Sequence, residues 1–171
     1  IEDVFQPFYR QTGASMSAFN AWMLVKSMET LRLRVEAMSA TASQLADKLA
    51  SHPAIENISY PGHASHPQFE LAKNNEGFGS LIAFQVKGGR QAAFQTLNSL
   101  KLIDISNNLG DAKSLACHPA STTHSNLSPE DRAALSITEG HIRLSVGLEH
   151  TSDLWADLSQ ALARSLPING H

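Results

Sequence analysis

Hydrophobic residues recur along the chain with two different spacings, one typical of helices and one typical of strands. Between residues 31 and 49, apolar side chains follow one another at intervals of three or four, which places them on one side of a helix. They are Leu31, Val35, Met38, Ala42, Leu45 and Leu49. The pattern predicts a helix over residues 17–50. Because Phe19 and Trp22 lie on a different side, we expect a kink or break between Glu29 and Arg34.

Alternation of apolar and polar residues predicts strands at two places. The clearer one is GSLIAFQVKGG, in which Ile82, Phe84 and Val86 share one face. The other is HIRLSVGLEH, residues 141–150, where Ile142, Leu144 and Val146 alternate with Arg143, Ser145 and Gly147. Shorter strands are expected within residues 54–62, 101–106 and 114–118.

The remaining segments read as helices over residues 66–74, 89–100, 128–135 and 152–166. In the second of these, Ala93, Phe94, Leu97 and Leu100 form the predicted buried side. The third begins with Ser128 as a cap and Pro129 at the first helical position. The whole order predicts an α+β fold of two layers, with a largely antiparallel sheet of four or five strands and helices on one face.

Length and charge narrow the classes of function. The 171 residues suit one compact domain, and a net charge of −3 without a Lys/Arg cluster argues against binding nucleic acid or an acidic membrane. A single cysteine excludes an internal disulfide framework, and no apolar run approaches the roughly 20 residues of a spanning helix. The first residues do not resemble a secretory signal, so a cytoplasmic protein is expected.

The sequence does not favour a metal site, a reactive cysteine or a phosphate-binding loop. His63 with His66, and His118 with His124, lack the spacing and the neighbouring carboxylates or cysteines of a metal site, so turn or surface histidines are expected. Cys117 lies in the short apolar run SLAC, which is more typical of a buried small residue than of a reactive thiolate. No glycine-rich segment has the form of a phosphate-binding loop.

Arg143 is the residue that the alternation does not explain. A guanidinium opposite the apolar face must reach solvent or meet an anion, and its fork suits a carboxylate. The alternatives are an exposed arginine on an edge strand, or a structural ion pair with a residue such as Glu149 or Asp111. Periodicity leaves these possibilities open. Polar side chains that could line a pocket occur nearby, at Asn107, Asn108, Ser121, Thr122, Thr123 and His124.

The segment NLGDAKSLACHPASTTHSNLSPEDRAALSITEGHIRLSVGLEH, residues 108–150, resembles the Cys/Met-metabolism (trans-sulfuration) family of pyridoxal-phosphate (PLP) enzymes. The resemblance extends back through residues 66–89 and 19–34, so it covers nearly the whole chain. Residues 66–89 and 106–115 are most similar to the sulfhydrylase branch, first to O-succinylhomoserine and then to O-acetylhomoserine sulfhydrylases. Cystathionine γ-synthases and γ-lyases share the family.

This resemblance implies the small C-terminal domain of a fold-type I PLP enzyme. Residues 1–30 would be a remnant of the large PLP domain and the connecting helix, and residues 31–171 the domain that binds the substrate carboxylate. The resemblance implies that Arg143 binds the α-carboxylate, with Asn108 as a second contact. The substrates implied are an O-acylhomoserine and sulfide, which give homocysteine in methionine biosynthesis.

The lysine that carries the cofactor in this family lies in a Ser-x-Thr-Lys setting, and none of the six lysines here has it. We therefore expect no catalytic residue in this chain, no PLP bound by it and no activity from it alone. We expect a homo-oligomer and a missing N-terminal PLP domain, against which Phe19, Trp22 and Met23 would rest. A stand-alone interaction module, in which Arg143 is only structural, is the alternative of another class.

Overall fold

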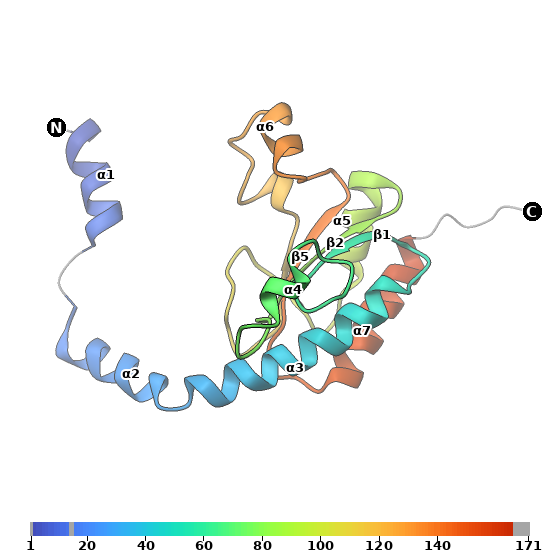
Figure 1. The fold of residues 1–171 in the computed structure, drawn as a ribbon. Coiled ribbons are helices and arrows are strands. Elements are labelled where there is room, and N and C mark those ends of the chain that lie inside the picture. The colour runs from blue at the N-terminus through green and yellow to red at the C-terminus, as the bar shows by residue number, and fades with distance from the viewer. Residues whose placement is uncertain (1, 14–15, 166–171) are drawn as a thin grey trace, which may run out of the picture. The chain divides into compact units, whose positions relative to one another are not determined.

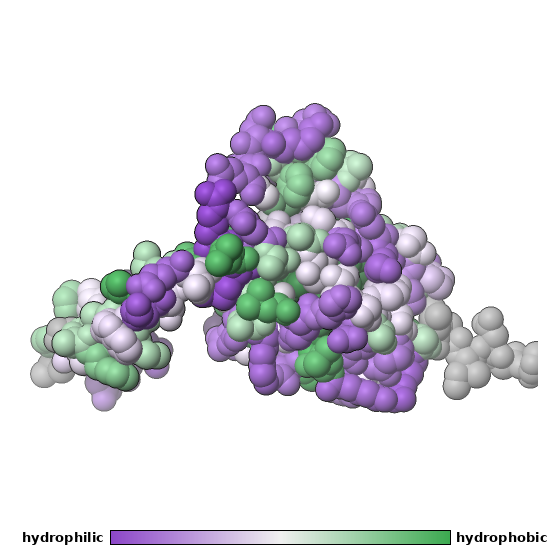
Figure 2. All heavy atoms as spheres, turned by 90° about the horizontal axis from the view of Figure 1, so that it is seen from below, coloured by the Kyte–Doolittle hydropathy of each residue, from purple (hydrophilic) through white to green (hydrophobic). Residues whose placement is uncertain are grey.

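The computed structural model describes residues 2–13 and 16–165, which divide into two compact units, Ile1–Leu33 and Arg34–His171. The first unit contains α1 (Glu2–Thr12) and α2 (Ala18–Met28) (Figure 1). The hydrophobic pattern did not predict α1. Apolar side chains such as Phe5, Phe19 and Trp22 are exposed in this unit. Green, hydrophobic residues are visible at the left of Figure 2.

The long predicted helix is broken, as expected, between α2 and α3 (Leu31–Ala50). Ser17 caps α2, because its Oγ accepts a hydrogen bond from the backbone N–H of Asn20 at 3.2 Å. The predicted apolar stripe of α3 is buried only from Met38 onward. Leu31 and Val35 are about 45% exposed, because the hydrophobic core that the helix helps to form begins at Ala42.

The second unit is built on a five-stranded sheet with the order β1-β2-β5-β4-β3. The strands are β1 (Ile55–Ser59), β2 (Leu81–Val86), β3 (Asp104–Ile105), β4 (Leu115–Cys117) and β5 (His141–Ser145). Three of the four pairings are antiparallel, and only β3 pairs with β4 in parallel. This confirms the predicted α+β class and the largely antiparallel sheet.

Helices α3, α5 (Gly89–Ser99) and α7 (Thr151–Ser165) form one hydrophobic core together with the sheet. The three helices lie on the same side of the sheet (Figure 1). Strands β2 and β5 supply the alternate residues Ile82, Phe84, Val86, Ile142 and Leu144 to this core, and Val146, directly after β5, continues the alternation. The prediction of a two-layer arrangement with helices on one face is therefore confirmed.

The connections contain the short elements α4 (Phe69–Ala72), η1 (Pro119–Ser121) and α6 (Pro129–Ala134). Ser128 caps α6 as predicted, since its Oγ accepts from the backbone N–H of Asp131 at 3.1 Å. One core prediction in α5 is wrong: Phe94 is 37% exposed, and its ring lies edge-on to the His118 ring, with 5.0 Å between the centroids. Leu166, the last residue of the helix predicted over residues 152–166, lies outside the described residues.

Asp157 of α7 fixes the chain between α5 and β3. Its carboxylate accepts hydrogen bonds from the backbone N–H groups of Lys101, Leu102 and Ile103 at 2.8 to 3.1 Å. Burial by itself raises the pKa of Asp157, but these N–H groups and the Gln160 amide outweigh it and bring the pKa below its ordinary value. The carboxylate is thus held in its charged form.

We predict that Asp157→Ala lowers the free energy of unfolding of the chain by about 3 kcal/mol, because one buried and two partly buried N–H donors lose their acceptor. The stabilisation is complete above the ordinary pKa of an aspartate, about 4, and disappears as the pH falls through the lower pKa of the folded state. Urea unfolding at pH 7 and pH 3 measures both effects. Asp47→Ala, which changes an exposed aspartate of α3, is the control. Equal losses for the two variants at pH 7 would contradict the prediction.

Candidate functional site

Arg143 lies at the centre of the sheet, on the face opposite the hydrophobic core. Strand β5 is the third of five strands, and Arg143 pairs with Ala83 of β2 on one side and with Cys117 of β4 on the other. Ile142 and Leu144, its neighbours along the chain, are 1% exposed on the core side. The alternative of an arginine on an edge strand is therefore wrong.

The guanidinium of Arg143 is held by main-chain carbonyls. Its Nη2 donates hydrogen bonds to the carbonyl oxygen of Asn107 at 2.7 Å and to that of Asn108 at 3.1 Å. The structure thus brings the two predicted site residues, Arg143 and Asn108, into direct contact through the backbone of Asn108. These contacts restrain the guanidinium but leave its positive charge uncompensated, because both acceptors are neutral.

Within residues 2–13 and 16–165, no acidic side chain forms an ion pair with Arg143. The two partners considered from the sequence are engaged elsewhere. Glu149 accepts hydrogen bonds from Ser114, and Asp111 accepts from the backbone N–H of Lys113 at 3.1 Å. The alternative of a structural ion pair is therefore wrong for both residues.

Alternate residues of the chain from β5 onward contact one loop, residues 106–114, that connects β3 to β4. Arg143 meets the carbonyls of this loop, and the buried Ser145 accepts a hydrogen bond from the backbone N–H of Gly110 at 2.9 Å. Gly147 packs so closely that a Cβ atom would lie 2.5 Å from the carbonyl oxygen of Ala112. The motif RLSVGLE therefore has a geometric basis, because its odd-numbered residues face the loop, whereas Leu144 and Val146 fill the core and Leu148 is exposed.

Glu149 and Ser114 complete these contacts at the end of the loop. The carboxylate of Glu149 accepts from the Ser114 backbone N–H at 2.7 Å and from the Ser114 hydroxyl at 2.8 Å. The same hydroxyl accepts from the backbone N–H of Gly147 at 2.8 Å. Ser145, Ser114 and Glu149 were not among the predicted site residues. The period-two spacing of Arg143, Ser145, Gly147 and Glu149 was the signal that could have found them.

A hollow of about 290 Å³ lies farther along the same face of the sheet. Ala83, Gln85 and Ser136 line it together with His141, which lies two residues before Arg143 on β5. Burial lowers the pKa of His141 and outweighs a hydrogen bond that the imidazole donates to the Ser136 backbone, which raises it; the neighbouring His118 and His124 also lower the pKa. His141 is therefore neutral at pH 7, and the positive charge on this part of the strand belongs to Arg143.

The other polar residues singled out in the sequence form local contacts instead of joining Arg143. Ser121 pairs with the imidazole of His118 at 2.9 Å, and Thr122 donates to the His118 carbonyl. The buried His118 also lies within hydrogen-bonding distance of the Glu139 carbonyl. Cys117 is buried, and no group of three potential metal ligands occurs in the described part of the chain.

Lys113 does not fit the lysine attachment point of PLP. Lys113 belongs to the loop that meets Arg143, but its Nζ donates to Asp104 at 3.0 Å. This hydrogen bond and the charge of Asp104 raise the pKa of Lys113, whereas an amine that reacts with a carbonyl must lose its proton. The absence of the cofactor lysine from this chain stays a prediction.

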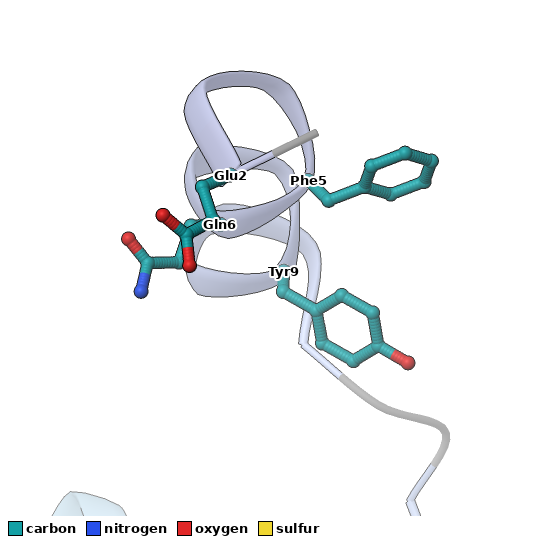
Figure 3. Close-up of a pocket in the computed structure, with 4 residues that line it drawn as sticks. All are labelled: Glu2, Phe5, Gln6 and Tyr9. Atoms are coloured by element: carbon teal, nitrogen blue, oxygen red, sulfur yellow. The ribbon is translucent and has the colours of Figure 1, made fainter.

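A second hollow, of about 230 Å³, lies on α1 in the first unit. Figure 3 shows the rings of Phe5 and Tyr9 extending to one side of this helix, and the polar ends of Glu2 and Gln6 extending to the other. Its lining comes from one helix and contains no cationic group. We therefore assign the candidate site to the face of the sheet around Arg143. No helix among the described residues is long and apolar enough to cross a membrane.

Comparison with known proteins identifies a family for this chain. The profile of the family described as Cys/Met metabolism PLP-dependent enzyme matches residues 2–163. O-succinylhomoserine sulfhydrylase from Mycobacterium tuberculosis is 48% identical in an alignment of 168 residues that covers 95% of this chain and 41% of that protein. L-methionine γ-lyase from Treponema denticola is 49% identical, over 88% of this chain and 38% of that protein. The chain spans about two fifths of these relatives.

A solved structure has the same fold. A crystal structure described as putative O-acetylhomoserine (thiol)-lyase from Campylobacter jejuni, with N'-pyridoxyl-lysine-5'-monophosphate, superimposes with a TM-score of 0.85. The sequences are 42% identical, and the match covers 91% of this chain and 38% of that one. The relatives therefore include sulfhydrylases and lyases at similar identity.

Proposed function

The chain belongs to the family of Cys/Met metabolism PLP-dependent enzymes, and we propose that it supplies the binding site for the α-carboxylate of an amino-acid substrate. Arg143 is the principal ligand of that carboxylate, and the side-chain amide of Asn108 donates a second hydrogen bond. The cofactor of the whole enzyme is PLP, which serves as an electron sink when it is bound. The proton-transfer chemistry belongs to residues outside this chain.

One observation supports this proposal above the others: Arg143 is a cation without an acidic partner in the described part of the chain. It is half-buried on the polar face of the sheet, and two neutral carbonyls orient it. A partly desolvated guanidinium gains most from a carboxylate that it can bind with two parallel hydrogen bonds. The role of Arg143 is to hold the substrate in one orientation, which is a contribution of positioning.

In this proposal the whole protein is an O-succinylhomoserine sulfhydrylase, which makes homocysteine from O-succinylhomoserine and sulfide. The extensive match to the Mycobacterium tuberculosis relative supports this reaction. Residues 1–30 then belong to the large cofactor domain and its connecting helix, and residues 31–171 form the carboxylate-binding domain. The enzyme works as a homo-oligomer in the cytoplasm. Because the relatives are enzymes, we favour this role over a stand-alone interaction module.

The second candidate is a methionine γ-lyase, because the Treponema denticola relative is as similar as the sulfhydrylase. Both reactions use an amino acid with an α-carboxylate, so Arg143 serves them equally. The reaction is therefore decided by groups other than this arginine.

An assay of the whole enzyme with three substrates tests the proposed reaction. We expect homocysteine to form from O-succinylhomoserine and sulfide, more slowly from O-acetylhomoserine, and little 2-oxobutanoate to be released from methionine. A kcat/KM about tenfold higher for the succinyl than for the acetyl ester corresponds to roughly 1.4 kcal/mol of selectivity. Efficient cleavage of methionine without homocysteine synthesis would assign the chain to a lyase.

A further inference from the structure

We propose that Ser145 and Glu149 are positioning residues that shape the carboxylate site through the loop of residues 106–114. This inference rests on the proposed function of Arg143. Neither side chain contacts the guanidinium in the described structure. Ser145 and Glu149 each hold a different part of the loop, and the carbonyls of this loop orient the guanidinium of Arg143.

Ser145 holds the middle of the loop. Its side chain is 1% exposed, and its Oγ accepts a hydrogen bond from the backbone N–H of Gly110. Gly110 has a φ of +76°, a left-handed conformation that other residues seldom adopt, and it lies two residues after Asn108. The hydrogen bond therefore fixes the turn that directs the Asn107 and Asn108 carbonyls towards Arg143.

Glu149 holds the end of the loop where it enters β4. Its two carboxylate oxygens accept from the N–H and the hydroxyl of Ser114, and that hydroxyl accepts from the N–H of Gly147. The close packing of Gly147 on residues 112 and 113 leaves no room for the loop to move inwards. The loop is thus attached at both Gly110 and Ser114 to the segment that carries Arg143.

The loop contacts order the Arg143 side chain before substrate binds. Both carbonyls accept from Nη2, which leaves Nε and Nη1 without a hydrogen-bond partner among the described residues. An arginine side chain has many rotamers, and ordering it in advance lowers the entropic cost of binding. Loosening the loop should therefore weaken the binding of a carboxylate while the affinity for the rest of the ligand stays the same.

Two competitive inhibitors of the whole enzyme separate these effects. L-Norleucine and pentylamine differ only in the α-carboxylate, so the ratio of their inhibition constants reports on the carboxylate site. We expect Ser145→Ala to raise the inhibition constant of norleucine about tenfold, the effect of one lost hydrogen bond, and to leave that of pentylamine unchanged. With the substrate, KM should rise more than kcat falls.

Ser39→Ala is the matched control. Ser39 is also a buried serine whose Oγ accepts a backbone N–H from a loop, that of Phe78 at 3.2 Å, but it lies on α3. This variant should leave the ratio of the two inhibition constants unchanged. If Ser145→Ala shifts both inhibitors equally, or shifts neither, the proposed role of Ser145 is refuted.

Glu149→Gln tests the other attachment with less risk to folding, because it keeps the size of the side chain. We expect the inhibition constant of norleucine to rise about fivefold, as for a weakened charged hydrogen bond, and that of pentylamine to stay unchanged. Combining either variant with Arg143→Ala should add nothing to the loss from Arg143→Ala alone, since the loop acts through the arginine. Additive losses would overturn the positioning role. An Arg143→Ala enzyme with unchanged norleucine binding would instead overturn the proposed function.

Discussion

Replacing Arg143 by alanine in the whole enzyme is expected to lower kcat/KM for the amino-acid substrate about a thousandfold and to leave the cofactor bound. Truncating one partner of a buried, hydrogen-bonded charge pair costs about 4 kcal/mol, and each 1.4 kcal/mol corresponds to a factor of ten. Steady-state kinetics measure the loss, and the absorbance of the bound cofactor shows that its own site is intact.

Two further variants give this prediction its controls. Arg143→Lys keeps the positive charge but loses the planar fork. Its kcat/KM should therefore recover to at most about a tenth of the value of the natural enzyme. Arg164→Ala removes an exposed arginine at the end of α7 and should have no effect on kcat/KM. If Arg143→Ala and Arg164→Ala behave alike, Arg143 has no role in substrate binding.

Phe84→Ala is expected to lower the free energy of unfolding by about 4 kcal/mol, because it leaves a cavity in the core of the sheet. Phe84 is 2% exposed on β2, where it pairs with Ile58 of β1 and Ile142 of β5. Urea unfolding of the chain measures the loss.

The same substitution at Phe94 is the control and also tests a corrected prediction. Phe94 is 37% exposed, and its ring contacts the His118 ring and the Arg90 guanidinium. Phe94→Ala should therefore lower the free energy of unfolding by only about 1 kcal/mol. A loss for Phe94→Ala as large as that for Phe84→Ala would mean that its side chain belongs to the core after all.

The strands that form the core were predictable because a strand has only two faces. Ile82, Phe84 and Val86 alternate without exception, so a single rule identified both the strand and its buried side. A helix gives a weaker signal, since its apolar stripe does not show which turns meet the sheet. For this reason the exposure of Leu31 and Val35 on α3, and of Phe94 on α5, could not be deduced from spacing.

The candidate site was predicted in part. Alternation singled out Arg143, but it could not distinguish an edge strand from the central one, because the pairing of strands depends on contacts between distant residues. Nor could it show that Arg143 meets the carbonyls of Asn107 and Asn108. Every residue carries a carbonyl, so contacts with the backbone have no signature in the side chains.

The most direct test of the central claim is the inhibition of the whole enzyme by L-norleucine and pentylamine, measured for the natural protein and for Arg143→Ala. If Arg143 binds the α-carboxylate, the natural enzyme should bind norleucine at least about a hundredfold more tightly than pentylamine, as expected for a charge-assisted pair worth roughly 3 kcal/mol. In Arg143→Ala this preference should disappear while pentylamine binds as before. A preference for norleucine that survives the loss of Arg143 would contradict the account.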